Sequence, residues 1–218
     1  LNQIERFKQF VQEQTARNYK QLSNKNLHDI YSTLLQLIME NGSYFAYSRQ
    51  ETIKPLKELI LSKLSLREDK KELFQLITTP TQEDLFLYEK RDRLKLFNKE
   101  SLELLLDSDL EEYARKNPWR FINTYSREEI YAFLKEEMKE TDNESLRKEI
   151  DNVVKDNKER KEKQEAFFDS FKDNQLRDIC LFLQNIAVIR LQNKNVWSGY
   201  EFLFLDLLDE IASRVGLS

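Results

Sequence analysis

Apolar side chains recur every three or four residues along most of this chain, which is the spacing of one face of an α-helix. The pattern predicts helices at about 1–19, 24–41, 43–64 with a restart near Arg49, 68–77, 82–96, 98–116, 127–139 and 142–164, followed by an apolar segment at 176–215. We therefore expect an all-α fold, an irregular multi-helix bundle of about 8–10 helices with one long charged helix or arm.

Polar residues and helix breakers predict where these helices begin and end. Asn41-Gly42 is expected to end the second helix, and Gly216 to follow the last one as its C′ residue. Pro55 predicts a kink or two abutting helices, because proline removes a backbone donor. The segment 190–200 is either a break or a continuous helix. Side-chain caps are predicted at Ser23, Thr81 and Asn98 and in the capping boxes Ser48-x-x-Glu51 and Ser126-x-x-Glu129.

Residues 142–165 are dominated by charged side chains, with Leu146, Ile150, Val153 and Val154 as their only apolar stripe. Glutamate and lysine favour helix at exposed positions, so we interpret this arm as a solvated helix rather than a flexible connector. We expect a single helical domain over 1–218. Its candidate subdivision is a helical core at 1–140, the charged arm at 141–165, and C-terminal helices at 166–218 that pack back on the core.

Composition narrows the classes of function. Three glycines and three prolines among 218 residues leave few helix breakers. A net charge of −4 with both signs interspersed argues against a nucleic-acid partner. No apolar run approaches 18 residues, so no membrane span is predicted, and the first residues lack the pattern of a signal peptide. We expect a cytoplasmic protein. Because the chain starts at Leu1 and stops at Ser218, we also expect it to be part of a longer one.

Few residues are suited to catalysis or metal binding. The only histidine, His28, lies between core positions and is interpreted as a surface or boundary residue of a helix. The only cysteine, Cys180, is expected to be a small buried hydrophobe. One cysteine and one histidine do not make a zinc site, and three scattered glycines do not make a phosphate loop. Glu136 and Glu137 are interpreted as members of solvated ion pairs. Alone, the chain is not expected to be an enzyme.

The longest interruption of the helical pattern, Asn117–Ser126, contains the candidate binding residues Trp119, Arg120, Phe121, Asn123 and Tyr125. An irregular segment between helices can direct aromatic and polar side chains into a cavity. The same aromatic residues are equally suited to be hydrophobic plugs that close a helix junction. Both interpretations stay open.

Three separated stretches resemble one protein family. They are Leu76-Ile-Thr-Thr-Pro-Thr-Gln-Glu-Asp-Leu85 with Arg93–Leu96, Leu110–Tyr125 with Glu129–Lys135, and Arg190 with Leu207–Ser218. Together they resemble the helical middle region of phosphoenolpyruvate-utilising, dikinase-type proteins, a group similar to phosphoenolpyruvate synthase and rifampicin phosphotransferase. The resemblance touches most of the chain from Leu76 onward.

The resemblance implies a helical region that works between two catalytic domains. In such proteins an ATP-grasp domain, which uses ATP and Mg²⁺, and a swivelling domain with a phosphorylatable histidine transfer the phosphoryl group. The partners implied are therefore these two domains of the same polypeptide, and the fragment itself holds no cofactor. A small-molecule substrate is implied to contact Trp119, Arg120, Phe121, Asn123, Tyr125 and Arg190. His28 is not in the family's histidine motif, so no catalytic role is assigned to it.

Two other interpretations of the whole chain stay open. The first is a stand-alone helical module that binds another protein through an apolar face. The second, a small HEAT-like scaffold, is disfavoured because no period of about 40 residues is visible.

Overall fold

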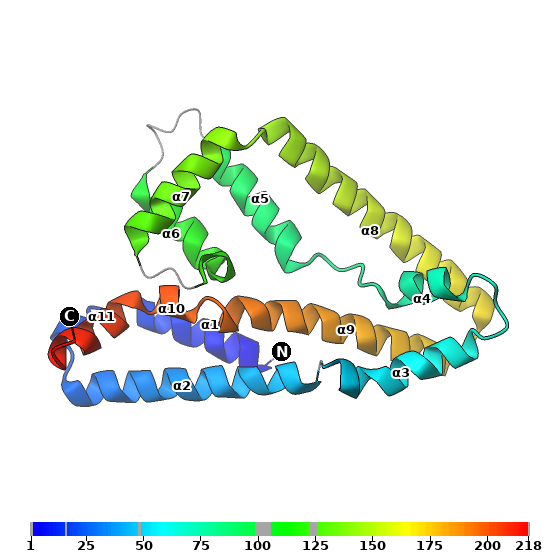
Figure 1. Cartoon of the computed structure of the whole chain (residues 1–218), viewed down its shortest axis with the longest axis horizontal. Coiled ribbons are helices and arrows are strands. Elements are labelled where there is room, and N and C mark those ends of the chain that lie inside the picture. The colour runs from blue at the N-terminus through cyan, green and yellow to red at the C-terminus, as the bar shows by residue number, and fades with distance from the viewer. Residues whose placement is uncertain (1, 16, 48, 99–105, 123–125, 218) are drawn as a thin grey trace. The chain divides into compact units, whose positions relative to one another are not determined.

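The computed structural model describes residues 2–15, 17–47, 49–98, 106–122 and 126–217 (Figure 1). Helices, the 3₁₀ turns included, account for 84% of the described residues, which contain eleven α-helices and no strand. The predicted all-α, multi-helix fold class is therefore confirmed.

The chain divides into two compact units. Unit 1 consists of Leu1–Ser43, Asp92–Thr141 and Gln192–Ser218, and unit 2 consists of Tyr44–Arg91 and Asp142–Leu191. The predicted single domain over 1–218, with its core, arm and C-terminal part, stays a prediction beside this division.

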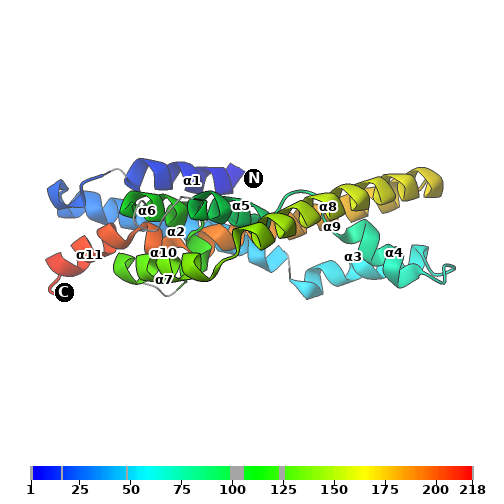
Figure 2. The same ribbon diagram turned by 90° about the horizontal axis from the view of Figure 1, so that it is seen from above.

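Unit 1 gathers helices from both ends and the middle of the sequence. They are α1 (Asn2–Thr15), the first part of α2 (Asn24–Tyr47), the last part of α5 (Leu85–Phe97), α6 (Asp107–Lys116), α7 (Arg127–Glu140), the end of α9 (Asn174–Trp197), α10 (Tyr200–Leu203) and α11 (Leu205–Arg214), with the 3₁₀ turns η1 (Tyr19–Gln21) and η3 (Pro118–Phe121). Helices α6 and α7 pack against each other, as Figure 1 and Figure 2 both show. The core contains buried apolar side chains of several helices, among them Phe7, Leu34, Leu110, Leu134 and Phe202.

The side chain of Arg214 joins α11 to the turn η1 within unit 1. Its Nη1 donates to the carbonyl of Leu22 and to Oδ1 of Asn24, both at 2.8 Å, and its Nη2 donates to the carbonyl of Lys20 at 3.3 Å. Glu210, one turn earlier on α11, accepts from its Nε at 2.7 Å. One guanidinium group therefore provides partners for carbonyls of a turn too short to satisfy them internally.

Unit 2 contains α3 (Gln50–Lys63), α4 (Lys70–Thr78), the start of α5, α8 (Asn143–Phe171) and most of α9. Its core cluster consists of Ile60, Leu64, Ile77, Phe168, Leu176, Cys180 and Leu183. Cys180 is buried, as predicted, and burial raises the pKa of its thiol to about 12. The thiol is therefore uncharged at neutral pH and packs as a small apolar side chain.

Two buried glutamines close the C-terminal end of α4. Gln164 of α8 donates from Nε2 to the carbonyls of Leu76 and Thr79, at 2.7 and 2.8 Å. Gln184 of α9 donates from Nε2 to the carbonyl of Ile77 at 2.8 Å and to Oε1 of Gln164 at 3.4 Å. The last carbonyls of a helix have no partner inside it, so these two amides take the place that water would have at an exposed helix end.

Several predicted helix ends are confirmed. Ser126 caps α7 by accepting from the backbone N–H three residues later, at 3.3 Å. Gly216 follows α11 with a φ of 73°, and the N–H of Leu217 donates to the carbonyl of Ala212 at 2.9 Å, which is a Schellman-type ending. The charged arm is helical, as predicted, and α8 continues beyond it to Phe171.

The predicted end of α2 at Asn41-Gly42 is wrong, because the helix continues to Tyr47. Asn41 is fully buried, and its Nδ2 donates to the carbonyl of Leu37 at 2.8 Å. Its amide therefore bonds back to the preceding turn inside the helix. A glycine in a helix interior costs only about 1 kcal/mol, so Gly42 alone does not have to end the helix.

Other predicted boundaries shift by a few residues. Helix α1 ends at Thr15 rather than near 19, and α5 begins at Leu85, where Asp84 rather than Thr81 caps it by accepting from the N–H of Leu87 at 2.9 Å. The predicted restart before α3 is confirmed, with Arg49 as its N-cap. Of the two alternatives for 190–200, the structure has a break, between the end of α9 at 197 and the start of α10 at 200. The predicted helix at 98–116 is described only as α6, since 99–105 lie outside the described residues.

The glutamine pair leads to a stability prediction. Gln164→Met keeps the length of the side chain but leaves the carbonyls of Leu76 and Thr79 buried without their donor. The free energy of unfolding is therefore expected to fall by about 2–4 kcal/mol, measured by urea denaturation followed by circular dichroism. The control is Gln175→Met, at an exposed position of α9, which is expected to change it by less than about 0.5 kcal/mol. An equal loss in both variants would contradict the role assigned to the amide.

Candidate functional site

The predicted binding segment forms the short turn η3 in unit 1. Helix α6 stops before it because Pro118 has no N–H to donate and disfavours helical geometry at the preceding residue. That residue, Asn117, is buried, and its backbone N–H and Nδ2 both donate to the carbonyl of Tyr113, at 3.0 and 3.2 Å. The described part of the interruption before residue 123 therefore contains a capped helix end followed by one turn of 3₁₀-helix.

The turn η3 is pressed against the residues that start α10. A Cβ added to Gly199 would lie 2.3 Å from Cβ of Pro118 and 2.7 Å from its carbonyl carbon, so only glycine fits this approach. Phe121 is buried, with its ring centroid 6.0 Å from that of Phe202 on α10. Pro118 and Phe121 thus make the contacts of side chains that close a helix junction.

Arg120 extends from η3 into a cluster of charged side chains. Its Nη1 and Nη2 donate to the two carboxylate oxygens of Glu137 on α7, at 3.1 and 2.8 Å, and Nη1 also donates to the hydroxyl of Tyr113 at 2.5 Å. Arg93 of α5 donates to the same carboxylate at 2.9 Å. The side chains of Arg120 and Glu137 are only 14% and 18% exposed, so water screens these charges weakly. Two guanidinium groups therefore share one carboxylate at this junction.

Glu137 is the residue of this cluster that the sequence interpretation missed. Its neighbour Glu136 is exposed and pairs with Lys139 at 2.8 Å, as predicted for a solvated ion pair. The same interpretation is wrong for Glu137, whose partners Arg93 and Arg120 come from other helices. Adjacent positions of a helix point in different directions, so a Glu-Glu pair places one carboxylate inward. The sequence signal that could have identified Glu137 was the apolar stripe of α7, because this stripe shows which side of the helix faces the rest of the unit.

The other predicted site residues fall in different places. Trp119 is partly buried, and Nζ of Lys194 lies 5.1 Å from its ring centroid, a cation–π contact within unit 1. Arg190 is at an exposed position of α9 and belongs to unit 2. Asn123 and Tyr125 lie outside the described residues. The structure therefore brings Trp119, Arg120 and Phe121 together in η3.

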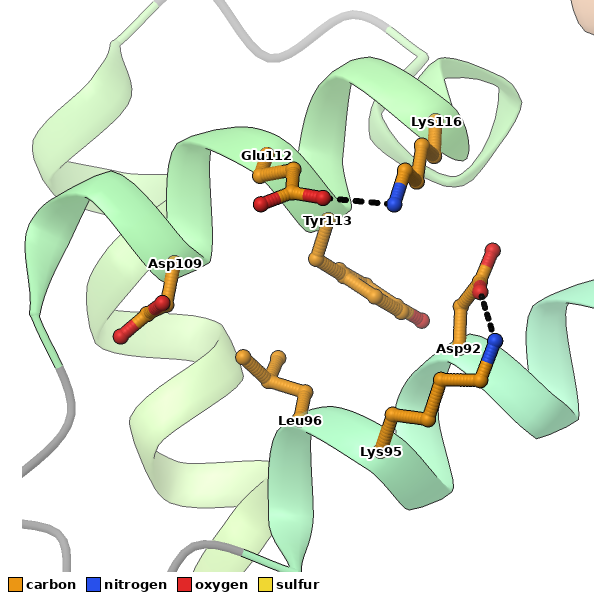
Figure 3. Close-up of a pocket in the computed structure, with 7 residues that line it drawn as sticks. All are labelled: Asp92, Lys95, Leu96, Asp109, Glu112, Tyr113 and Lys116. Carbon is orange, nitrogen blue, oxygen red and sulfur yellow. Dashed lines mark hydrogen bonds and ion pairs between the residues drawn. The ribbon is translucent and has the colours of Figure 1, made fainter.

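A small pocket lies between α5 and α6 beside the Arg120 cluster, with a volume of about 160 Å³ (Figure 3). The ring of Tyr113 lines it while the hydroxyl of Tyr113 binds Arg120, so the pocket and η3 share this side chain. Both lysines that line it are paired: Lys95 with Asp92 at 3.5 Å, and Lys116 with Glu112 at 2.6 Å. The hydrogen bond between Lys116 and Glu112 raises the pKa of Lys116. Ligand pockets usually measure about 300–1,000 Å³, so this one is too small for a drug-sized ligand.

The structure also bears on metal binding, on the environment of His28 and on whether a helix could span a membrane. Within the described residues, no group of three or more His, Cys, Asp or Glu side chains is placed to hold a metal ion. His28 is exposed on α2 with Nδ1 3.5 Å from Asp29, which confirms its interpretation as a surface residue. None of the helices in the described ranges combines the length and the apolar character needed to cross a membrane.

Comparison with known proteins adds no relative: no protein-family model, curated protein or solved structure matches this chain. The resemblance to dikinase-type proteins therefore rests on its three stretches of residues alone.

The shared carboxylate leads to a second stability prediction. Glu137→Gln keeps the shape of the side chain but removes the negative charge that Arg93 and Arg120 share, so the free energy of unfolding is expected to fall by about 2–4 kcal/mol. Glu136→Gln, one residue earlier and exposed, is the matched control and is expected to cost less than about 1 kcal/mol. Guanidinium chloride would screen the cluster, so urea denaturation is the appropriate measurement. Equal losses in the two variants would show that Glu137 does not hold the junction.

The contact between Pro118 and Gly199 leads to a third stability prediction. Gly199→Ala places a methyl group inside the proline ring's contact distance, so the backbone must shift, at an expected cost of about 1–3 kcal/mol. A thermal melt followed by circular dichroism measures the change. Ser198→Ala, at the adjacent position, is the control. An alanine variant as stable as the wild type would contradict the close approach.

Proposed function

We propose that this chain is a helical substrate-holding or linker domain of a phosphoenolpyruvate-utilising, dikinase-type phosphotransferase. In this proposal other domains of the same polypeptide, of the ATP-grasp and swivelling-histidine types, carry out the chemistry with ATP and Mg²⁺. The basis is the resemblance of three separated stretches in the expected order, from Leu76 to the end of the chain.

One structural observation supports the proposal: each stretch contributes an internal link that holds helices together. In the first stretch, the carbonyls of Leu76 and Thr79 accept from Gln164. In the second, Arg120 binds Glu137. In the third, Arg214 donates to the carbonyl of Lys20 in the turn η1 and to that of Leu22, which directly follows the turn. Polar residues used in this way fit a domain whose task is to keep a fixed shape for chemistry performed elsewhere.

In this proposal the side chains of η3 have two roles, support of the segment and contact with the substrate, and their contacts indicate which role each has. Arg120 and Phe121 are occupied by Glu137 and Phe202, which suits support of the segment from behind. Trp119 is partly exposed next to Lys194, so it is the described member of the predicted set with accessible aromatic surface. We therefore assign substrate contact to Trp119 before the other two.

The proposal is tested on the full-length gene product that contains this chain. Incubation with labelled ATP and Mg²⁺ is expected to place an acid-labile phosphoryl group on a histidine outside residues 1–218, identified by peptide mapping. Residues 1–218 alone serve as the control and are expected to stay unlabelled. Labelling within 1–218, or no labelling of the full-length product, would overturn the proposal.

Substrate contact leads to a prediction on the same full-length protein. Trp119→Ala and Tyr125→Ala are expected to lower kcat/KM for transfer to the substrate by about tenfold or more, because stacked aromatic surface is lost. Histidine labelling and the melting temperature are expected to stay unchanged. If both variants instead lose cooperative melting, the two aromatics are plugs of the helix junction.

A second candidate function is a stand-alone module that binds another protein. It is favoured by Leu35 and Met39, which lie one helical turn apart on α2 and are 40% and 74% exposed. Exposed apolar residues at this spacing are typical of a helix face that contacts a partner. The second candidate replaces the first if the intact gene product transfers no phosphoryl group and its specific partner is lost on Leu35→Glu together with Met39→Lys.

A further inference from the structure

A second pocket lies in unit 2, and none of its lining residues belongs to the predicted site. It has a volume of about 370 Å³, within the usual range for a small ligand. Helices α8 and α9 supply most of its lining, notably Lys161, Glu165, Phe168, Arg177, Leu181 and Gln184.

Arg177 places a guanidinium group on a fixed platform in this pocket. Its Cζ lies 5.8 Å from the ring centroid of Phe168, and Phe168 belongs to the buried core cluster of unit 2. Among the described residues, neither Arg177 nor Lys161 has a carboxylate within ion-pair distance. This cation–π contact leaves the N–H groups of the guanidinium available to a ligand.

The two buried amides of the lining cannot supply donors to a ligand. Gln164 uses both N–H groups of Nε2 on the carbonyls of Leu76 and Thr79, and Gln184 uses both of its own on the carbonyl of Ile77 and on Oε1 of Gln164. The side-chain donors that remain in the lining are those of Thr81 and Gln82 and the two cationic side chains, Lys161 and Arg177. Lys161 and Arg177 against Glu165 give the lining a net charge of +1, which complements a monoanion. Leu181 adds an apolar wall.

We propose that this pocket binds a small organic carboxylate with an apolar body. Arg177 holds the carboxylate through two parallel hydrogen bonds, Lys161 adds a second positive charge, and Leu181 contacts the apolar part of the ligand. The proposal is independent of the phosphotransferase proposal, because the pocket shares no residue with η3 and lies within unit 2.

The test uses benzoate as the probe, titrated into the 218-residue chain and followed by chemical shifts of the backbone amides. We expect saturable binding, with shifts confined to α8, α9 and the residues after α4. Acetate lacks the apolar body and benzyl alcohol lacks the charge, so each is expected to bind about tenfold more weakly or worse. Inorganic phosphate is expected to be a weaker ligand than benzoate, since it cannot use Leu181.

Variants separate a built site from general attraction of anions. Arg177→Gln is expected to weaken benzoate binding by about tenfold or more, and Arg177→Lys and Lys161→Gln by less. Lys163→Gln is the matched control: it is exposed on α8, does not line the pocket, and is expected to have no effect. If Arg177→Gln lowers the melting temperature, Lys161→Gln, at an exposed position, replaces it as the variant that tests the proposal. Absence of saturable binding, equal binding of phosphate and benzoate, or an equal loss in Lys163→Gln would overturn the proposal.

Discussion

Backbone carbonyls left without partners at helix ends are the constraint on which both units depend. The chain meets it with long polar side chains that come from far along the sequence. Gln164 reaches the carbonyl of Thr79 across 85 positions, and Arg214 reaches the carbonyl of Leu22 across 192. With three glycines in the chain, few helix ends can be closed by a glycine in the left-handed conformation, as Gly216 closes α11. The same bonds that satisfy the backbone therefore also fix which helices lie together within each unit.

This constraint explains which parts of the fold were predictable from the sequence. Ser126 and Gly216 act within one helical turn of their own positions, so their roles follow from local chemistry and were predicted. Asn41 and Thr81 have residue types that favour helix ends, yet a buried contact of Asn41 and a competing cap at Asp84 decide the outcome. Local patterns give the existence of each helix, whereas its last residues depend on partners that no window of sequence contains.

The candidate site likewise has one part that the local sequence predicts and one part that depends on distant residues. The interruption at η3 was predicted, because Pro118 breaks the helical pattern by itself. The partners of Arg120 were not, since Glu137 and Arg93 lie 17 and 27 positions away on other helices, and both have residue types common on solvated faces. An arginine flanked by aromatic residues attracts attention as a binding residue. Whether its charge is already neutralised inside the fold is a tertiary property.

The two arginines of interest illustrate how charge balance separates support from recognition. Arg120 and Arg177 both lie near aromatic rings, at 6.0 Å from Phe121 and 5.8 Å from Phe168. Arg120 also binds a carboxylate bidentately, so an incoming anion would have to displace Glu137, which is largely buried and would keep only its bond to Arg93. Arg177 carries no such cost, because no carboxylate of the described residues lies within ion-pair distance of it. Of the two, Arg177 is therefore the residue at which an anionic ligand gains a hydrogen-bonded partner without breaking one.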